Sequence, residues 1–401
     1  MRRIGIIGGG QLARMAIEEA RKYLAHVEVL TPEYPSPASE IADAAHVGPL
    51  DDYESVLEFA EEVDVVSYET EGASVEALRE LERLGKAVLP SAGILAIVKD
   101  KFAQKSLLIS AGIPTARCLL LRSEVEEGSA SVEAAAESLG GFPVVQKARS
   151  DDHQKKGGVA VLQGPGSAGR IAAPSFVEEF VDFERELAVV IARAPGGATV
   201  AYPCVEMAFD ARAGKCDSVL APARISAARC EEAENIALAA VRALCDAAEK
   251  AGSPATGSAG VFAVELFLTR SGDVLVNEIA PRPGDSGCFS IEACVASQFD
   301  QYIRLLMGMP LGSPRLLSPA MTVKLSCGPD CGEGEPEYIG LERALAVPGV
   351  SIHLYGKREL RPFRRLGHLT ALGSTADEAI ARAEAARSCL RIVGRRPPAR
   401  R

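Results

Sequence analysis

Along the first quarter of the chain, short apolar runs typical of strands alternate with segments whose apolar residues have helical spacing. The strands predicted from short β-branched runs are residues 3–7, 27–30 and 63–69, and the helices predicted from helical spacing are residues 12–23 and 74–84. Strands that alternate with helices form a parallel sheet with helices on its faces, because each parallel strand needs a crossover connection. We therefore expect a Rossmann-like α/β domain over residues 1–98, without implying a nicotinamide cofactor.

The order of elements changes beyond residue 98. A helix is predicted over residues 99–115, closed by Gly112 and Pro114, and an amphipathic helix over residues 291–310. The strand segments predicted between them are residues 142–150, 176–193, 261–269 and 274–280. The domains expected after the first are residues 99–312, a smaller β-rich domain over residues 313–394, and a disordered tail over residues 395–401.

Composition narrows the class of protein. The chain has 401 residues, of which 47% are hydrophobic and 24% charged, as in soluble globular proteins. Its net charge of -10 argues against nucleic-acid binding, which needs a basic surface. No apolar run approaches the roughly 20 residues that cross a bilayer, and MRRIGIIGGGQ predicts a first strand and not a targeting peptide. The ten scattered cysteines are expected to be reduced, in a cytoplasmic protein with no membrane partner.

A hairpin is predicted where VFAVELFLT is joined to VLVNEIA by RSGD. Glycine accepts a positive φ, and Ser and Asp bond their own backbone, so RSGD has the composition of a tight turn. With Ser271 and Gly272 at the centre, equal steps along both strands place Glu265 opposite Glu278. Their Cβ atoms would then be about 5 Å apart.

Two facing carboxylates indicate a metal site. They repel and lose hydration on an apolar sheet face unless a cation is shared between them. The apolar residues on the face of Glu265 are Val261, Ala263 and Phe267. They disfavour the alternative, a solvated hairpin with outward glutamates. Mg²⁺, with Mn²⁺ as an alternative, prefers one or two carboxylates plus phosphate oxygens, so a nucleoside triphosphate is the implied partner. Asn277 and Arg282 would place donors beside the metal.

The glycine turn after the first strand is a second candidate site. Its N–H groups at the start of a helix form a natural seat for an anion. Gly8, Gly10 and Ala13 also match the pattern G-x-G-x-x-A, but Thr31 stands where a ribose-binding acid is expected, so a hydride-transfer enzyme is a minor alternative. The strand that ends in YETE places acids at the ligand-binding edge of the sheet. Alternatively, Glu71 supports the start of the next helix.

Cationic and acidic side chains in the middle of the chain suggest nucleotide contacts. Lys101 and Lys105 share a helix face, either as a solvated stripe or in reach of a nucleotide. Lys147 precedes the polar loop DDHQKKGG, which is a plausible lid, and is a plausible phosphate ligand. The residues proposed for adenine and ribose are Glu178, Glu179, Val181 and Glu186.

The C-terminal region contains the densest basic cluster of this acidic chain. Its members are Lys357, Arg361, Arg364, Arg365 and His368. Such a cluster suits an anionic substrate. The alternative is a basic hairpin edge that blocks aggregation.

Five separated motifs occur in the order of one known family: GGGQLARM, SYETEG, KDKFAQK, NEIAPRP with SIEACVASQFDQ, and HLYGK with RRLGH. Over nearly its full length the chain resembles the N5-carboxyaminoimidazole ribonucleotide synthases, ATP-grasp enzymes of purine biosynthesis. The resemblance implies an α/β and α+β architecture with a pre-ATP-grasp domain, an ATP-grasp domain and a small β-rich domain, and it implies a homodimer. The implied reaction phosphorylates bicarbonate with ATP and transfers the carboxyl group to 5-aminoimidazole ribonucleotide.

The resemblance also implies roles for individual residues. The implied ATP ligands are Lys101, Lys147, Lys156, Gly157, Glu178, Glu179, Phe180, Val181, Glu186, Asn277 and Glu278. The implied ligands of the ribonucleotide are Gln11, Leu12, Glu71, Ser286, Lys357, Arg364 and Arg365, the last three on its 5′-phosphate. The implied catalytic residues are Lys156, Arg282, Glu265 and Glu278, of which the two glutamates hold the metal.

Three stretches depart from the family pattern. The lid G-G-Y-D-G-K-G-Q is replaced by Asp151–Gly158, E-N-x-H by Glu206–Phe209, and H-N-S-G-H by Gly284–Cys288. These changes surround the expected bicarbonate and imidazole side, whereas the acidic pair and the phosphate cluster are intact. Three readings stay open: a divergent synthase, a carboxylate-amine ligase with a different acceptor, and a non-catalytic sensor of a purine intermediate.

Overall fold

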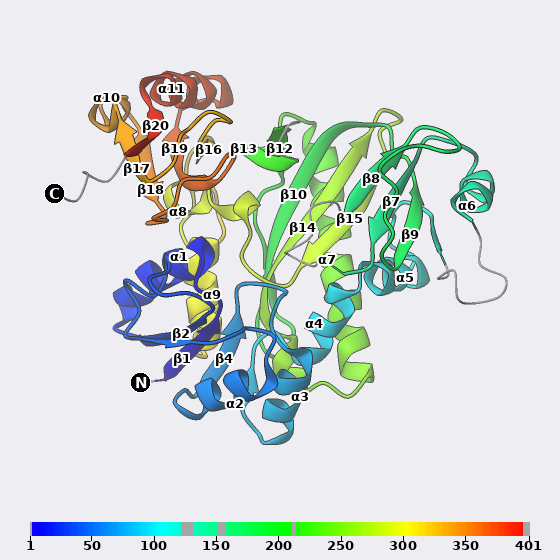
Figure 1. Cartoon of the computed structure of the whole chain (residues 1–401), viewed down its shortest axis with the longest axis horizontal. Helices are drawn as coiled ribbons and strands as arrows, with labels where there is room; N and C mark the ends of the chain where they lie inside the picture. Colours follow the sequence, from blue (N-terminus) through cyan, green and yellow to red (C-terminus); the bar gives the residue numbers. More distant parts are fainter. Residues whose placement is uncertain (1, 122–130, 151–157, 211–213, 396–401) are drawn as a thin grey trace.

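Five parallel strands form the first sheet, in the order β3-β2-β1-β4-β5, at the lower left of Figure 1. The strands are β1 (Arg3–Ile7), β2 (His26–Thr31), β3 (Ala44–Val47), β4 (Val65–Tyr68) and β5 (Ala87–Val88). The helices are α1 (Gln11–Ala20), α2 (Tyr53–Glu61), α3 (Val75–Arg83) and α4 (Ala92–Lys99), with the 3-10 turn η1 (Arg21–Tyr23). The computed structural model describes residues 2–121, 131–150, 158–210 and 214–395. The predicted Rossmann-like architecture is confirmed.

A small antiparallel sheet, in the order β6-β9-β7-β8, lies at the right of Figure 1. Its strands are β6 (Cys118–Leu120), β7 (Val144–Ala148), β8 (Val159–Leu162) and β9 (Ser175–Glu179). Helix α5 (Lys101–Ser110) precedes it, and α6 (Val132–Ser138) covers one face through Val132, Ala135 and Ala136. This unit therefore has its own small apolar core.

The largest sheet has nine strands, eight in the order β15-β14-β10-β12-β13-β16-β19-β18 and β11 beside β10. Its strands are β10 (Phe183–Arg193), β11 (Thr199–Ala201), β12 (Val205–Asp210), β13 (Lys215–Ala221), β14 (Gly260–Thr269), β15 (Val274–Ala280), β16 (Ala320–Ser326), β18 (Val350–Leu354) and β19 (Arg365–Leu372). The sheet runs without interruption across the domain boundary predicted at residue 312, because β13 pairs with β16.

The C-terminal strands carry further small elements. They are β17 (Glu335–Ile339), which pairs with β20 (Arg391–Arg395), and the helices α10 (Leu341–Leu345) and α11 (Ala376–Cys389). The predicted β-rich character of this region is confirmed. Most of the tail predicted to be disordered, residues 396–401, lies outside the described residues.

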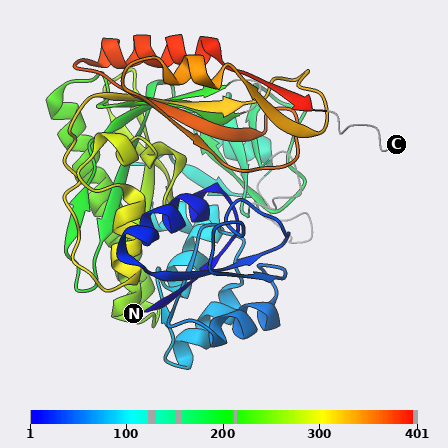
Figure 2. The same cartoon turned by 90° about the vertical axis from the view of Figure 1, so that its left-hand side faces the viewer.

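Both faces of the large sheet are buried at its centre, which explains the unbroken apolar run in β10. Leu187 and Val189 pack on the face covered by α7 (Ala227–Lys250). The alternate residue Ala188 packs on the opposite face, in the cluster that contains residues of α1 and of α9 (Gln298–Leu306). Figure 2 shows α1 in blue beside α9 in yellow, so this second face of the sheet is turned towards the N-terminal domain.

Two segments predicted as single elements each contain two. The predicted helix over residues 291–310 is wrong: α8 (Ser290–Ala293) is separated from α9 by extended backbone at Cys294, which bridges to Leu316. Ser297 then caps α9 by accepting the N–H of Asp300. The segment over residues 176–193 divides into β9 and β10.

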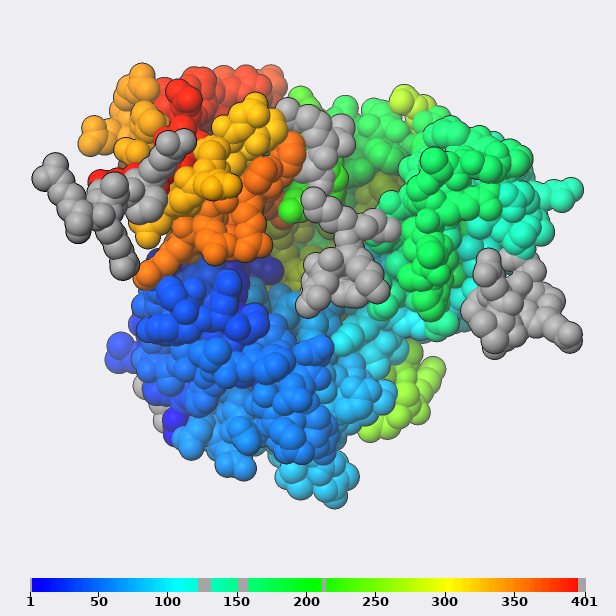
Figure 3. Space-filling model, in the orientation of Figure 1, coloured from blue at the N-terminus to red at the C-terminus, as the bar shows by residue number. Residues whose placement is uncertain are grey.

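Three regions of the chain meet at a recess on the face shown in Figure 3. The N-terminal domain is drawn in blue, the C-terminal strands in orange and the small sheet in green. No described helix is both long enough and apolar enough to span a bilayer. The predicted site residues come from these three regions and from the hairpin of β14 and β15.

Candidate active site

The hairpin of β14 and β15 carries the predicted acidic pair, and Glu265 does lie directly opposite Glu278. This pairing is confirmed, but the count that predicted it is wrong nearer the turn. Leu266 pairs with Val276, whereas equal steps from the predicted turn place Asn277 there. Asn277 is instead the extra residue of a β-bulge. Without the bulge, Glu265 would face Asn277 and the two carboxylates would be apart.

The turn of this hairpin explains why a bulge is needed. The N–H of Gly272 donates to the carbonyl of Thr269 at 2.9 Å, and the N–H of Thr269 donates to the carbonyl of Asp273 at 2.9 Å. Gly272 has a φ of 92°, as in the common three-residue hairpin loop. The loop is therefore Arg270–Gly272 and not a turn centred on two residues.

The acidic pair is electrostatically unfavourable without a cation. Burial, and then the negative charge of Glu278, raise the pKa of Glu265 to about 8. Burial acts in the same direction on Glu278, but Lys101 and Lys147 hold its pKa below the usual range. Glu186 of β10 lies on the same sheet face, and burial raises its pKa to about 7. Three acids in a row on one face favour a bound cation.

The donor set fits Mg²⁺ completed by phosphate. Among the described residues, no group of three or more His, Cys, Asp or Glu side chains is arranged to hold a metal ion. Two carboxylates alone are a weak site, whereas two carboxylates plus phosphate oxygens are the usual environment of Mg²⁺. Lys101 Nζ lies 3.5 Å from Glu278 Oε2, where it would also face a bound phosphate.

A buried carboxylate ties the small sheet to the hairpin. Glu178 of β9 lies 3.0 Å from Lys105 Nζ and 2.7 Å from Lys147 Nζ. Lys147 also donates to Asn277 Oδ1 at 3.0 Å, and Lys105 donates to the Asn277 carbonyl at 3.1 Å. Lys105 is therefore neither the solvated residue nor the nucleotide ligand that its helical position left open. It fixes Glu178, while Lys101 reaches the acidic pair.

The anion seat at the glycine turn is filled by the protein itself. Glu69, at the end of β4, accepts the N–H of Gly10 at 2.6 Å and the N–H of Ala13 at 3.2 Å. A Cβ on Gly10 would lie 2.6 Å from Glu69 Oε1, and one on Gly8 would lie 2.4 Å from Glu69 Cγ. The start of α1 therefore already holds one carboxylate, and an external anion on the other N–H groups of the turn stays a prediction.

Glu69→Ala is expected to lower the free energy of unfolding by about 1–2 kcal/mol, since it removes the acceptor of two N–H groups at a helix start. Urea denaturation measures this change. Glu69→Gln, which keeps an acceptor oxygen, should lose less. Equal stability of the alanine variant and the wild type would contradict this capping role.

Arg282, after β15, connects the acidic pair with the N-terminal domain. Its Nε lies 2.9 Å from Glu71 Oε1, and its Nη2 donates to Glu71 Oε2 at 3.2 Å. Burial opposes its charge, but Glu71 and then Glu69 keep the pKa of Arg282 raised. The positive charge of Arg282 opposes the rise in the pKa of Glu265, and it adds to the effect of Lys324 and Arg365 in lowering the pKa of Asp285. Arg282 therefore interacts electrostatically with acids on both sides of the recess.

Of the basic cluster, Lys357, Arg361 and Arg364 lie in the connection between β18 and β19, and Arg365 and His368 lie in β19. Burial, and then the positive charge of Arg364, lower the pKa of Lys357 to about 8, while Asp285 and Glu69 oppose this shift. Arg365 forms an ion pair with Asp285. The edge strand β18 carries no Lys or Arg, which disfavours the alternative of an aggregation-blocking edge. Lys357 and Arg365 thus lie near Asp285 in the loop after β15, whereas Arg361 pairs with Glu359 and His368 is buried against Tyr355.

Other predicted residues are placed less directly. The Glu179 carboxylate accepts hydrogen bonds from the backbone N–H and the guanidinium of Arg117, at 2.9 and 2.7 Å. A contact of Glu179 with a nucleotide would therefore be made by the Glu179 backbone. Leu12 is in the apolar core, Gln11 is half-buried, and Ser286 is buried. Phe180 is 43% exposed beside half-buried Val181. Lys156, Gly157 and most of the predicted lid lie outside the described residues.

Two buried glutamines support the site and were not recognised from the sequence. Gln104 donates to the carbonyl of Ile279 at 2.9 Å and accepts its N–H at 2.8 Å. Gln298 does the same with Gly284, at 2.7 and 3.1 Å. Each amide satisfies both backbone groups of one residue, which holds β15 and the loop after it. The motifs KDKFAQK and SQFDQ contain them, but nothing in their spacing marks an amide clamp.

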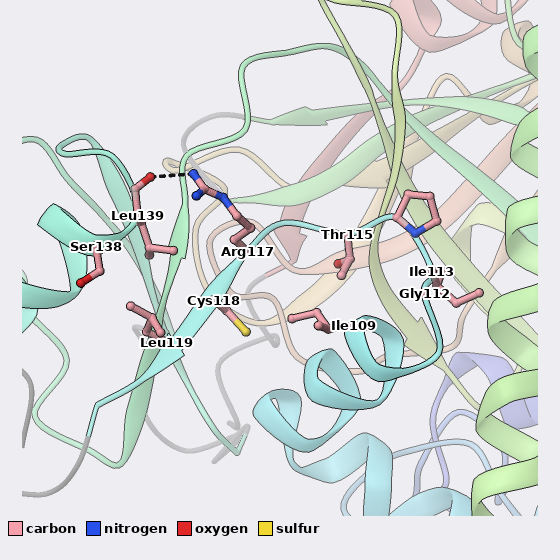
Figure 4. Close-up of a pocket in the computed structure, with 10 residues that line it drawn as sticks. Ile109, Gly112, Ile113, Thr115, Arg117, Cys118, Leu119, Ser138 and Leu139 are labelled. Atoms are coloured by element: carbon pink, nitrogen blue, oxygen red, sulfur yellow. Dashed lines mark hydrogen bonds between the residues drawn. The ribbon is translucent and has the colours of Figure 1, made fainter.

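A separate pocket of about 570 Å³ lies between the end of α5 and β6 (Figure 4). Its lining residues are Ile109, Gly112, Ile113, Pro114, Thr115, Arg117, Cys118, Leu119, Ser138 and Leu139. Arg117 extends towards Leu139 and donates to its carbonyl at 2.8 Å. None of these residues is a predicted ligand of ATP or the acceptor, so this pocket is distinct from the charged recess.

Several proteins are similar over most of the chain. The N5-carboxyaminoimidazole ribonucleotide synthase of Synechococcus elongatus is 35% identical, across 92% of this chain and 88% of that protein. The crystal structure of the N5-carboxyaminoimidazole ribonucleotide synthetase from Thermotoga maritima has a TM-score of 0.86 and 40% identity, covering 98% of this chain and 100% of that one. The N5-carboxyaminoimidazole synthase from Aspergillus clavatus, solved with ADP and 5-aminoimidazole ribonucleotide, has a TM-score of 0.82 and 30% identity, covering 97% and 98%.

Longer relatives also match. The phosphoribosylaminoimidazole carboxylases of Vigna aconitifolia and Ogataea methanolica are each 33% identical across 93% of this chain, which spans 64% and 66% of their length. Three family models match in order: the ribonucleotide synthetase preATP-grasp domain at residues 1–99, the ATP-grasp domain at 106–299, and the phosphoribosylaminoimidazole carboxylase C-terminal domain at 332–382. The fold and these family models place the chain in the ATP-grasp class. Within that class, the chain belongs to the N5-carboxyaminoimidazole ribonucleotide synthase family.

Proposed function

We propose that this protein carboxylates 5-aminoimidazole ribonucleotide with bicarbonate and ATP, for purine biosynthesis. The observation that carries the proposal is the position of Arg282 in the chain, between Glu278 of β15 and Asp285, which forms an ion pair with Arg365. These neighbours mark two half-sites. One half-site is the acidic pair with Lys101 and Lys147, and the other is the basic cluster around Lys357. A triphosphate at the first and a phosphorylated acceptor at the second would meet beside Arg282. The Aspergillus relative was solved with ADP and 5-aminoimidazole ribonucleotide together, which supports separate sites for a nucleotide and a ribonucleotide.

The proposed reaction has two steps. A bicarbonate oxygen attacks the γ-phosphorus of ATP and the bond to the β–γ bridging oxygen breaks, which gives carboxyphosphate and ADP. The exocyclic amine of the ribonucleotide then attacks the carboxyl carbon, loses a proton and releases phosphate. Both steps move negative charge between oxygens, so positioned cations lower the barrier more than covalent chemistry does.

The chain's own residues would divide this work. Lys101 and Lys147 offset charge on the transferred phosphoryl group, and Arg282 holds the carboxyphosphate next to the acceptor. When bound to Glu265 and Glu278, Mg²⁺ would supply charge neutralisation on the β- and γ-phosphate oxygens. Lys357, Arg364 and Arg365 would anchor the 5′-phosphate, which keeps the amine within reach. The homodimer and the cytoplasmic location stay predictions from the sequence and its family.

ATP turnover with bicarbonate, measured with and without 5-aminoimidazole ribonucleotide, tests the proposal. Strong stimulation by the ribonucleotide is the expected result, together with one N-carboxylated product per ADP. Turnover that ignores the ribonucleotide would favour a ligase with another acceptor. Half-exposed Phe209, in the E-N-x-H position, is the feature that favours this second candidate. Tight ATP binding without turnover would favour the sensor.

The ribonucleotide kcat/KM is expected to fall above pH about 8. Lys357 has a pKa of about 8, so it is positively charged below that pH and loses its attraction for phosphate above it. Lys357→Arg should move this fall to higher pH, because a guanidinium stays charged. Lys357→Met should raise the KM for the ribonucleotide far more than that for ATP. If kcat/KM for the ribonucleotide fell at the same pH in Lys357→Arg as in the wild type, the fall would belong to another group.

A further inference from the structure

A buried ion cluster joins the loop after β15 to the C-terminal strands. Lys324 of β16 is 1% exposed, and its Nζ donates to Asp285 Oδ1 at 2.7 Å. The same Nζ lies 3.4 Å from Cys288 Sγ. The second carboxylate oxygen of Asp285 pairs with Nη1 of Arg365, whose Nη2 donates to the Cys216 carbonyl at 3.1 Å. Asp285 is therefore held between two cations.

The cluster connects two substitutions within one of the departing stretches, Gly284–Cys288. Asp285 and Cys288 stand where that pattern has Asn and His, and both contact Lys324. Burial raises the pKa of Asp285, but Lys324 and Arg365 outweigh it and hold that pKa well below its usual range. An unpaired carboxylate beside a phosphate site would repel the ligand, whereas the charge of Lys324 cancels it. Conversely, Lys324 needs Asp285 to keep its charge in the interior.

The same contacts fix the orientation of Arg365. A guanidinium has five N–H donors in a rigid plane, and two of them are used by Asp285 and Cys216. In the described part of the chain no other acceptor bonds Arg365, and 17% of its side chain is exposed. Two fixed donors set the plane of the guanidinium, so the others have a defined direction.

We propose that Asp285 is a positioning residue that makes the enzyme select phosphorylated acceptors, by fixing Arg365 while Lys324 balances its charge. The inference rests on the proposed function and deepens it, because it names the residues that recognise the 5′-phosphate of the acceptor. Asp285 touches neither substrate nor metal in this scheme. It contacts Arg365 directly, and its charge also helps to keep Lys357 protonated.

The double variant D285N/K324M gives the cleanest test. It removes one negative and one positive charge, so the net charge next to the phosphate is unchanged and no buried lysine is left unpaired. The kcat/KM for 5-aminoimidazole ribonucleotide is expected to fall about 10-fold or more, through KM, since Arg365 is no longer held. The kcat/KM for the dephosphorylated riboside, and the KM for ATP, should stay within about twofold.

Two comparisons make the result specific. D285N alone should show the same loss of phosphate selectivity together with a lower melting temperature, because it leaves Lys324 unpaired. Asp43→Asn is the matched control: it breaks a carboxylate pair with Arg21, at 3.0 and 2.8 Å, in the N-terminal domain and outside the proposed machinery. Its selectivity should equal that of the wild type.

Equal losses for the ribonucleotide and the riboside in the double variant would overturn the proposal, and so would an unchanged ribonucleotide KM. A wild type that the ribonucleotide does not stimulate would instead refute the proposed function. In that case calorimetry with inorganic phosphate decides the inference. The wild type should bind phosphate about 10-fold more tightly than D285N/K324M, and equal affinities would overturn it.

Discussion

Glu278→Gln is expected to lower Mg²⁺-dependent ATP turnover by about 10²–10³-fold, since it removes one of two carboxylates that would hold the metal on the transferring phosphate. Glu278 faces Glu265 across the hairpin and lies 3.5 Å from Lys101 Nζ. The variant keeps the size and hydrogen-bonding shape of the side chain. It loses the charge that binds a divalent cation.

The melting temperature of Glu278→Gln in the absence of metal is expected to be close to that of the wild type. The lost repulsion with Glu265 offsets the lost ion pair with Lys101. Glu232→Gln, an acid on α7 paired with Arg229, is the matched control and should keep full turnover. Wild-type turnover in Glu278→Gln would remove the metal assignment, and joint loss of turnover and stability would indicate a structural role.

Arg282→Gln is expected to lower the kcat of the ribonucleotide-stimulated reaction by about 10²–10³-fold, as removal of a charge-stabilising donor does in other enzymes. Arg282 is the cation that acts on both Glu265 and Asp285, and Glu71 fixes its guanidinium at two atoms. Arg282→Lys should recover little, because an ammonium keeps the charge and loses the planar fork.

The affinity for ATP distinguishes a catalytic role of Arg282 from a general disruption of the active site. Calorimetric Kd values for Mg²⁺-ATP should change by less than about threefold in Arg282→Gln, since Lys101 and Lys147 lie on the nucleotide side. Arg304→Gln, which breaks a pair with Asp300 on α9, is the control for loss of an ion-paired arginine. A kcat near that of the wild type, or an equal loss of ATP affinity, would contradict the assignment.

Part of the site follows from local sequence. The strands that carry Glu265, Glu278, Lys147 and Glu178 were predicted, because period-two apolar patterns and a glycine turn act over a few residues. Even here the pairing was reached by an incorrect count. The extra residue in the loop and the bulge at Asn277 offset each other, and neither has a sequence signal strong enough to predict.

Other parts of the site were out of reach of any local pattern. Glu69 and Gly10 are 59 residues apart, and Lys324 and Asp285 are 39 apart. Lys105 and Lys101 share a helix face, yet one is buried against Glu178 and the other faces Glu278. Spacing cannot distinguish two lysines one turn apart when their surroundings come from different sheets.

By itself, the sequence determined the alternating strands and helices of the first domain, the order of the three domains, the acidic hairpin and the family, because these depend on periodicity, turn residues and short motifs. The tertiary structure alone decided which charges neutralise each other. Glu69 fills the glycine turn, Lys105 holds Glu178, and Lys324 balances Asp285. The physical reason is that a buried charge must find a partner within a few ångströms, and packing, not chain order, decides which partner that is.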